Sequence, residues 1–198
     1  MQTKNSLLDY YKEVSSDAPA PGGGSVSAYL ITLSIGLYLM SIKVSIKRKR
    51  FLALDEEIQN GVKSNIKKIE DINMQIMEYV DKDLTTFNTF MEAYRSKDEQ
   101  RIKEETINCF YGPYNVLNLL FKAIDVMMID YHYVVKSIVS DLKISLMNLN
   151  VLIDGTKENI DVNLKNIDDE NIKELAKVAY ANIVIYKQKI KQVLDELN

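Results

Sequence analysis

One acidic residue lies in an otherwise apolar stripe, and it is the first candidate for chemistry in this sequence. Residues spaced by three and four fall on one face of a predicted helix, and they are Ile69, Ile72, Ile76, Tyr79, Asp83, Phe87, Phe90 and Tyr94. Burying an ionised carboxylate is costly unless a charge or hydrogen-bond donors meet it. Asp83 is therefore either a structural residue bonded to a neighbouring helix or a functional acid or base.

A glycine-rich turn is the second candidate. From residue 18 to 28 the sequence reads APAPGGGSVSA, and Ser25 is the expected N-cap of a long helix. Such a turn lets the backbone approach another group closely, and the helix start offers free N–H donors that suit a carboxylate or phosphate. The segment lacks the Gly-Lys-Ser/Thr of a Walker loop and the preceding strand of a dinucleotide motif. A tight turn between two packed helices is the alternative explanation.

The composition limits the classes of function. The chain has 198 residues and a net charge of −3 with both signs scattered, which gives no argument for nucleic-acid binding. Cys109 and His132 are the only cysteine and histidine, so a disulfide framework and a Cys/His-rich metal site are excluded. We expect no metal and a reduced, cytoplasmic protein. Cys109 is expected to be a small buried side chain, and His132 a surface or helix-end residue.

The elements that must position these residues are all predicted to be helices. Three prolines, seven glycines and long periodic stretches predict an all-α protein, one domain over residues 1–198, built as an elongated bundle of about five to six long helices. The expected helices span residues 7–14, 25–50, 52–94, 99–131, 133–153 and 172–197. Pro113 should kink or divide the fourth of these, and Gly155 should end the fifth as a left-handed cap. Residues 159–169 are expected to be irregular.

The second helix raises a question about membranes. Residues 18 to 42 carry no charge, and Lys43 and the run from Lys47 to Arg50 follow, which by length and flank is typical of a membrane span. Its many serines, with Thr32 and Gly36, favour a buried helix of a soluble protein instead. A helix that is apolar on most sides must be covered all round, and a symmetric dimer would cover it. We therefore expect a homodimer and no membrane.

Several segments together resemble one known family. In chain order they are Pro19 to Ser25, Met40 with Ser45-Ile46 and Lys49-Arg50-Phe51, Asp83 with Phe87 and Met91-Glu92-Ala93-Tyr94-Arg95, Pro113, Ser140-Asp141-Leu142, and Asn159-Ile160-Asp161-Val162-Asn163-Leu164. This series is similar to the motifs of the cyclodeaminase/cyclohydrolase family. That family comprises the C-terminal domain of formiminotransferase-cyclodeaminase and the stand-alone methenyltetrahydrofolate cyclohydrolases.

The resemblance covers nearly the whole chain and implies an all-helical homodimer acting on a folate one-carbon unit. The implied reaction is hydrolysis of 5,10-methenyltetrahydrofolate to 10-formyltetrahydrofolate, with the tetrahydrofolate derivative as substrate and no separate cofactor. The alternative reaction is the ammonia-releasing formiminotetrahydrofolate cyclodeaminase, which we consider second because no formiminotransferase domain is fused to this sequence.

Two departures from the family pattern leave a third interpretation open. Lys47 stands where the family has glycine, and Val134 to Ser137 replace its Gly-Asn-x-Asn. If these positions line the folate cleft, the protein binds a different substrate or is a diverged, non-catalytic helical dimer that retains the scaffold.

The implied chemistry assigns roles to individual residues. Methenyltetrahydrofolate has a cationic amidinium carbon, so its hydrolysis needs a negative group and a group that moves protons. Asp83 is the first candidate for both tasks. Asp141, which shares a helix edge with Ile138 and Ser145, is the second, and a capping or solvated aspartate is the alternative there.

The expected substrate-binding residues come from the glycine turn, the basic run and the matching late motifs. They are Gly22, Gly23, Gly24, Ser25, Lys49, Ser140, Asn159 and Asn163. The helix start at Gly22 to Ser25 and the run from Lys47 to Arg50 are the positions that can receive the anionic glutamate tail of a folate. A solvated basic helix end is the alternative explanation of the basic run.

Overall fold

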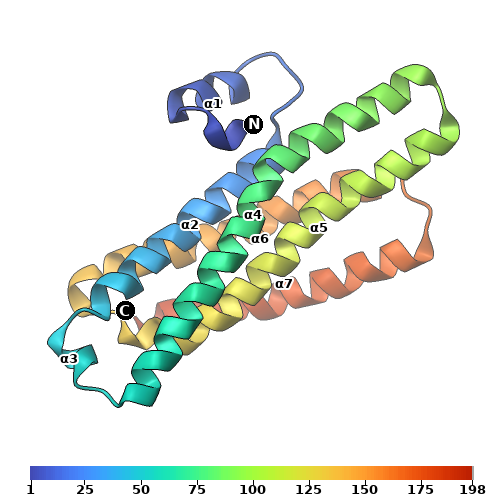
Figure 1. The fold of residues 1–198 in the computed structure, drawn as a ribbon. Helices are drawn as coiled ribbons and strands as arrows, with labels where there is room; N and C mark the ends of the chain where they lie inside the picture. Colours follow the sequence, from blue (N-terminus) through green and yellow to red (C-terminus); the bar gives the residue numbers. More distant parts are fainter. Residues whose placement is uncertain (198) are drawn as a thin grey trace.

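Five long helices joined by short turns build the molecule, as the computed structural model shows for residues 1–197 (Figure 1). The helices are α1 (Leu7–Val14), α2 (Gly23–Ser45), α3 (Lys49–Leu52), α4 (Glu56–Ser96), α5 (Glu99–Asp130), α6 (Val139–Leu164) and α7 (Glu170–Glu196). Single 3₁₀ turns lie at Gln2–Lys4, Tyr131–Tyr133 and Lys136–Ile138. No strand occurs among the residues described. The prediction of an elongated all-α bundle is therefore confirmed.

Helix α2 packs against both α4 and α6 and runs antiparallel to each of them. Toward α4, the Asn73 amide donates a hydrogen bond to the carbonyl of Thr32 over 3.2 Å. Toward α6, the Ser145 hydroxyl donates to the carbonyl of Ser34 over 2.6 Å. The side of α2 that faces the core is completely buried at Ile31, Ile35, Tyr38 and Ile42. This burial accounts for the apolar residues on the inner side of α2.

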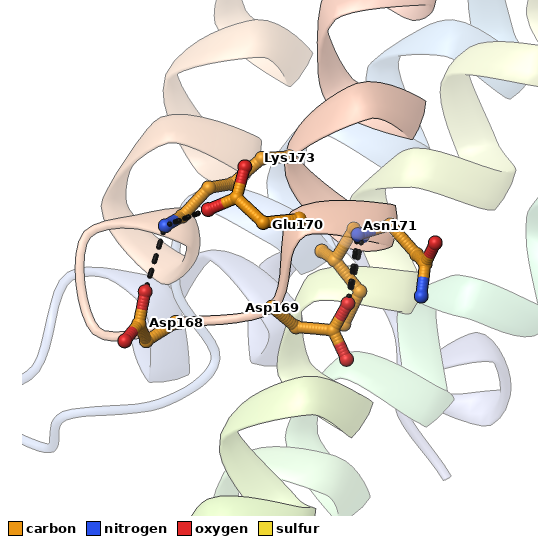
Figure 2. A network of polar contacts seen from close by, with 6 residues as sticks. Asp168, Asp169, Glu170, Asn171 and Lys173 are labelled. Atoms are coloured by element: carbon orange, nitrogen blue, oxygen red, sulfur yellow. Dashed lines mark hydrogen bonds and ion pairs between the residues drawn. The ribbon is translucent and has the colours of Figure 1, made fainter.

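Side-chain caps fix where the later helices begin. The Asp98 carboxylate accepts a hydrogen bond from the backbone N–H of Arg101 over 3.1 Å at the start of α5. Asp169 does the same for α7 by accepting from the N–H of Asn171 over 2.9 Å, as Figure 2 shows. In the same turn, the Lys173 ammonium pairs with Asp168 and Glu170. Carboxylates at these positions satisfy the free N–H groups of a helix start and oppose its positive end.

Several predicted helix ends were wrong. Helix α2 has Gly22 as its N-cap, with Ser25 inside its first turn, and it ends at Ser45. Helix α5 continues through Pro113 without dividing. Helix α6 continues through Gly155 to Leu164, because Ile153, Thr156 and Ile160 all bury their side chains in the bundle. A helical glycine costs only about 1 kcal/mol, and this packing outweighs it.

The outer side of α2 remains apolar and accessible. Leu30, Leu33 and Met40 are exposed, although 56% of the most apolar 18-residue window of the helix is buried inside the fold. Within the part of the chain that the structure describes, α2 is the one helix long and apolar enough to cross a membrane. The core helix of a soluble protein has the same length and composition, and the packing of α2 against α4, α5 and α6 is that of a core helix.

Candidate active site

A cleft of about 610 Å³ opens where the start of α2 meets α4, α5 and the end of α6. Its walls come from residues 19–27, 79–89, 105–116 and 156–163, which are far apart in the sequence. The volume lies within the range of small-molecule and cofactor sites. Apolar and aromatic side chains, among them Tyr79, Phe87 and Val116, line it together with many polar side chains. A cleft of this volume and lining can hold a small organic ligand.

Asp83 projects from α4 toward the start of α2. The backbone N–H of Ser25, in the first turn of α2, donates a hydrogen bond to Asp83 Oδ2 over 2.9 Å. Burial raises the pKa of the Asp83 carboxyl, and the hydrogen bond from Ser25 lowers it by a smaller amount. The anion expected at this helix start is therefore the protein's own carboxylate.

The close approach of Asp83 to α2 requires glycine. A Cβ atom at Gly24 would lie 2.0 Å from Asp83 Oδ1, and one at Gly23 would lie 2.8 Å from Asn159 Oδ1. Both distances are shorter than side chains tolerate, so any larger residue must displace the polar group that it meets. The two glycines thus allow a carboxylate and an amide oxygen to lie directly against the helix start.

Ser25 lies next to the cleft and fixes the start of α2. Its side chain is completely buried, and its hydroxyl donates to the carbonyl of Val80 over 2.9 Å. The Tyr10 hydroxyl lies 2.9 Å from the same oxygen. These contacts fix the start of α2 against α4 and α1, so that the Ser25 N–H points at Asp83. Ser25 therefore holds the carboxylate in place through its backbone.

Asn159 presents a hydrogen-bond acceptor to the cleft. Its amide nitrogen donates to Ser27 Oγ over 3.2 Å and to the carbonyl of Gly155 over 3.1 Å. With both amide hydrogens used, the side-chain oxygen is left to accept a bond from a ligand. This oxygen lies next to Gly23, on the wall that also holds Asp83.

Pro113 accounts for the position of Asn163. A proline has no N–H, so the carbonyl four residues earlier in the helix, that of Cys109, loses its helical partner. The Asn163 amide donates to this carbonyl over 2.9 Å and to the carbonyl of Asn159 over 2.9 Å. The proline in α5 thereby ties α6 to α5 at the cleft.

The Asp83 carboxylate has no ion-pair partner among the described residues of the cleft. Lys82, the neighbouring residue, pairs instead with Glu78 over 2.7 Å and lies over the ring of Tyr79. Among residues 1–197 no lysine or arginine forms an ion pair with Asp83. Burial raises the pKa of the Cys109 thiol to about 11, so this side chain is neutral in the cleft. An accessible carboxylate without a counterion favours a cationic ligand.

The structure brings together seven of the ten residues predicted for the site. Gly22, Gly23, Gly24, Asp83, Asn159 and Asn163 line the cleft, and Ser25 holds Asp83. In the part of the chain that is described, no group of three or more histidine, cysteine, aspartate or glutamate side chains could hold a metal ion.

Three predicted residues lie elsewhere. Asp141 and Ser140 begin α6, and Asp141 is about 27 Å along that helix from Asn159. Lys49 is exposed in α3, beyond the far end of α2, which is about 33 Å long. The helical period put Asp141 on one edge with Ser145, which is completely buried, but it carries no information on which end of a helix reaches the cleft.

The sequence analysis did not predict that α5 lines the cleft, nor that Ser27 and Thr156 do. Glu105, Asn108 and Asn115 line the cleft, as do Ser27 and Thr156. The three residues of α5 are spaced by three and seven, so they share a helix face with a signal as regular as that of the apolar stripe. A search for polar stripes that flank Pro113 would have found them.

Comparison with known proteins gives one consistent result. The family model described as formiminotransferase-cyclodeaminase matches residues 6–182. The chain is 23% identical to a methenyltetrahydrofolate cyclohydrolase of Methylorubrum extorquens, over 88% of this chain and 89% of that protein. It is 25% identical to the formimidoyltransferase-cyclodeaminase of Mus musculus, over 85% of this chain and 32% of that protein, so it spans about a third of the longer relative.

A solved structure has the same fold. The formiminotetrahydrofolate cyclodeaminase from Thermotoga maritima superposes with a TM-score of 0.87 and 21% identity. The match covers 100% of this chain and 99% of that one. All the helices described above thus belong to one shared architecture.

Proposed function

This chain belongs to the formiminotransferase-cyclodeaminase family, and we propose that it hydrolyses 5,10-methenyltetrahydrofolate to 10-formyltetrahydrofolate. The observation that carries the proposal is Asp83, an accessible carboxylate without a counterion in a cleft large enough for a pteridine. The substrate has a positive charge delocalised over its amidinium carbon and two nitrogens. Binding it next to Asp83 supplies the missing counterion.

The arrangement of groups fits each step of the hydrolysis. Water adds to the amidinium carbon and passes one proton to Asp83, whose raised pKa makes it a stronger base than an exposed aspartate. The C–N5 bond of the adduct then breaks as the added hydroxyl loses its proton and becomes the formyl carbonyl. N5 takes up a proton, and the formyl group stays on N10. One proton is released overall, because a cation and water give a neutral product. Water is the only co-reactant, so the reaction requires no separate cofactor.

Asn159 and the glycine turn orient the ligand in this proposal. The Asn159 oxygen, fixed by the bonds from its amide to Ser27 and Gly155, can accept an N–H of the pteridine. Because Gly23 and Gly24 have no side chains, the ligand can reach Asp83.

The second candidate reaction is cyclodeamination of formiminotetrahydrofolate with loss of ammonia. Two observations favour it: the likeness of fold to the cyclodeaminase from Thermotoga maritima, and the sequence likeness to the vertebrate cyclodeaminases. The same carboxylate would stabilise the amidinium cation, which is here the product.

One pair of assays separates these functions. The purified protein is incubated with methenyltetrahydrofolate, whose ultraviolet absorbance falls on hydrolysis, and separately with formiminotetrahydrofolate, from which ammonia release is measured. Cyclohydrolase activity predicts a catalysed fall of absorbance and little ammonia. Ammonia release would assign the cyclodeaminase, and no turnover of either substrate would favour the non-catalytic scaffold.

The proposal includes a cytoplasmic homodimer with α2 near the subunit interface. Its support is the exposed apolar side of α2, where Leu33 is 50% exposed although it lies in the middle of the most apolar helix. Light scattering should give a dimer at micromolar concentration, and the protein should stay in the supernatant after lysis without detergent. A stable monomer contradicts the dimer, and sedimentation with membranes contradicts the cytoplasmic assignment.

A further inference from the structure

The basic run from Lys47 to Arg50 lies far from the cleft of its own subunit. Lys47, Arg48, Lys49 and Arg50 are all exposed and follow the end of α2. The cleft lies at the opposite end of α2, about 33 Å away, which is far beyond the reach of a side chain. If this run acts on the cleft, the contact must come from a second subunit.

The apolar residues on the outer side of α2 are spaced symmetrically along the helix. Leu30, Leu33 and Met40 are exposed, and three half-buried residues continue the same line. The complete stripe is Val26, Leu30, Leu33, Leu37, Met40 and Val44. Its steps of four and three are those of a helix–helix seam. Because the steps are symmetric about residue 35, an antiparallel copy places Leu30 opposite Met40 and Leu33 opposite Leu37.

This pairing covers more apolar surface than a shifted one. Glycines precede the stripe and Lys47 follows it, so its two ends are defined. A shift of the antiparallel pair by seven residues would leave Met40 and Val44, or Val26 and Leu30, without a partner on each copy. Full overlap is therefore the favoured alignment.

Charge selects the antiparallel orientation. Residues 43–50 contain five lysines and arginines and no acidic residue. A parallel pair would place two such segments side by side, which like-charge repulsion opposes. An antiparallel pair separates them by the length of α2 and places each beside the uncharged segment at residues 18–24 of the other copy, which borders the cleft.

We propose that a second copy of this chain packs antiparallel on α2, so that its basic run lies at the opening of this subunit's cleft and binds the anionic tail of the ligand. The proposal rests on the proposed function, because the folate substrate class carries a chain of glutamate carboxylates. Each active site is then completed by both subunits: Asp83 and Asn159 come from one, and the basic run comes from the other.

Cross-linking tests the pairing without any measurement of activity. A chain with both Leu30→Cys and Met40→Cys should form an interchain disulfide under mild oxidation, because these positions face each other. The single variant Leu30→Cys should not, since its two copies would lie about 15 Å apart along the helix and a disulfide requires Cα atoms within about 7 Å. The unchanged chain, whose one cysteine is Cys109, is the background control.

Either of two results would overturn the pairing. A disulfide in the single variant would indicate a parallel dimer, and no disulfide in either variant would show that α2 does not pair in this register. Recovery of the chain only with membranes would assign the stripe to lipid and overturn the proposal as well.

A mixed dimer tests whether the basic run acts across the interface. One chain carries Asp83→Asn, and the other carries glutamine at positions 47–50; differently tagged chains allow the mixed dimer to be purified. Its only functional Asp83 lies in the chain without the basic charges. Action across the interface predicts a KM for triglutamyl methenyltetrahydrofolate close to that of the wild type. Action within one chain predicts a KM raised roughly tenfold, as in the homodimer of the glutamine variant.

The two proposals fail in different ways. If the wild type does not turn over methenyltetrahydrofolate, the proposed function fails, while the cross-link still decides the pairing. If the wild type is active and the mixed dimer has the raised KM, the proposed function stands and the contact across the interface is refuted. Thermal unfolding of both variant chains confirms that each is folded.

Discussion

Asp83 and Asp130 are the same residue type in opposite ends of the bundle, and burial raises the pKa of both. Asp130 is only 3% exposed and accepts a hydrogen bond from the Asn65 amide over 3.0 Å, with Lys68 and His132 close enough to favour its charge. Asp83 is half-buried, is bonded by a backbone N–H and lines a large cleft. A raised pKa thus does not by itself make a carboxylate a candidate for function; access to a ligand is needed as well.

The surroundings of the two carboxylates explain this difference. The partners of Asp130 are side chains, namely the Asn65 amide with Lys68 and His132 nearby. Asp83 faces the backbone of α2, where Gly24 leaves no atom between the helix and the carboxylate. The backbone holds Asp83 in a fixed place while its open side remains free for a ligand.

The largest expected effect comes from Asp83→Asn. The change keeps the size of the side chain and its bond from the Ser25 N–H but removes the negative charge. Turnover of methenyltetrahydrofolate should fall roughly hundredfold or more, because a cation and a transferred proton both need the carboxylate. Absorbance kinetics measure the rate, and thermal unfolding confirms the fold. Wild-type turnover in a folded variant would remove Asp83 from the mechanism.

Gly24→Ala should have the next largest effect. The added Cβ would lie 2.0 Å from Asp83 Oδ1, so the carboxylate must move. Displacement of a catalytic group by about 1 Å reduces rates by up to roughly a hundredfold, and we expect kcat/KM to fall between tenfold and a hundredfold. Gly61→Ala is the matched control, because nothing lies within 4 Å of its added Cβ. That control should raise the unfolding free energy by about 0.5–1 kcal/mol and leave turnover unchanged.

Asp130→Ala should give the reverse result. Removing the carboxylate leaves the half-buried Asn65 amide without its acceptor and empties a buried position, which should lower the free energy of unfolding by about 1–3 kcal/mol. Because Asp130 does not line the cleft, kcat and KM should equal those of the wild type. Denaturant unfolding and steady-state kinetics on the same preparation test both statements. A large loss of turnover at unchanged stability would show that the two carboxylates do not have separate roles.

The smallest expected effect is a difference in pH dependence. A carboxyl whose pKa is raised on folding contributes stability below its ordinary pKa of about 3.9 and loses it as pH rises through the raised value. The unfolding free energy of Asp130→Asn should therefore fall less steeply with pH above 4 than that of the wild type. In the wild type, kcat/KM should decline on acidification at a pH above the ordinary aspartate value, as Asp83 takes up a proton. A stability profile of Asp130→Asn identical to that of the wild type would contradict the raised pKa of Asp130.

The sequence by itself determined the helical class and singled out Asp83, which lines the cleft. The regular steps around Asp83 predicted both the face of α4 and the anomaly on it, because a helical period depends on local geometry alone. The glycine turn predicted either an anion site for a ligand or a tight turn between packed helices, and the group that lies against it is the carboxylate of Asp83. The family resemblance supplied Asn159 and Asn163, which the structure places in the cleft.

Only the tertiary structure decided which helix ends meet. Asp141 and Lys49 carry suitable chemistry, but the antiparallel packing of α2 with α4 and α6 puts both far from Asp83. Helix α6 also continues through Gly155, where the glycine predicted a helix end. The burial of residues on both sides of Gly155 outweighs the small free-energy cost of a glycine in a helix. A sequence shows which face of a helix is buried, whereas contacts between segments distant in sequence decide what that face meets.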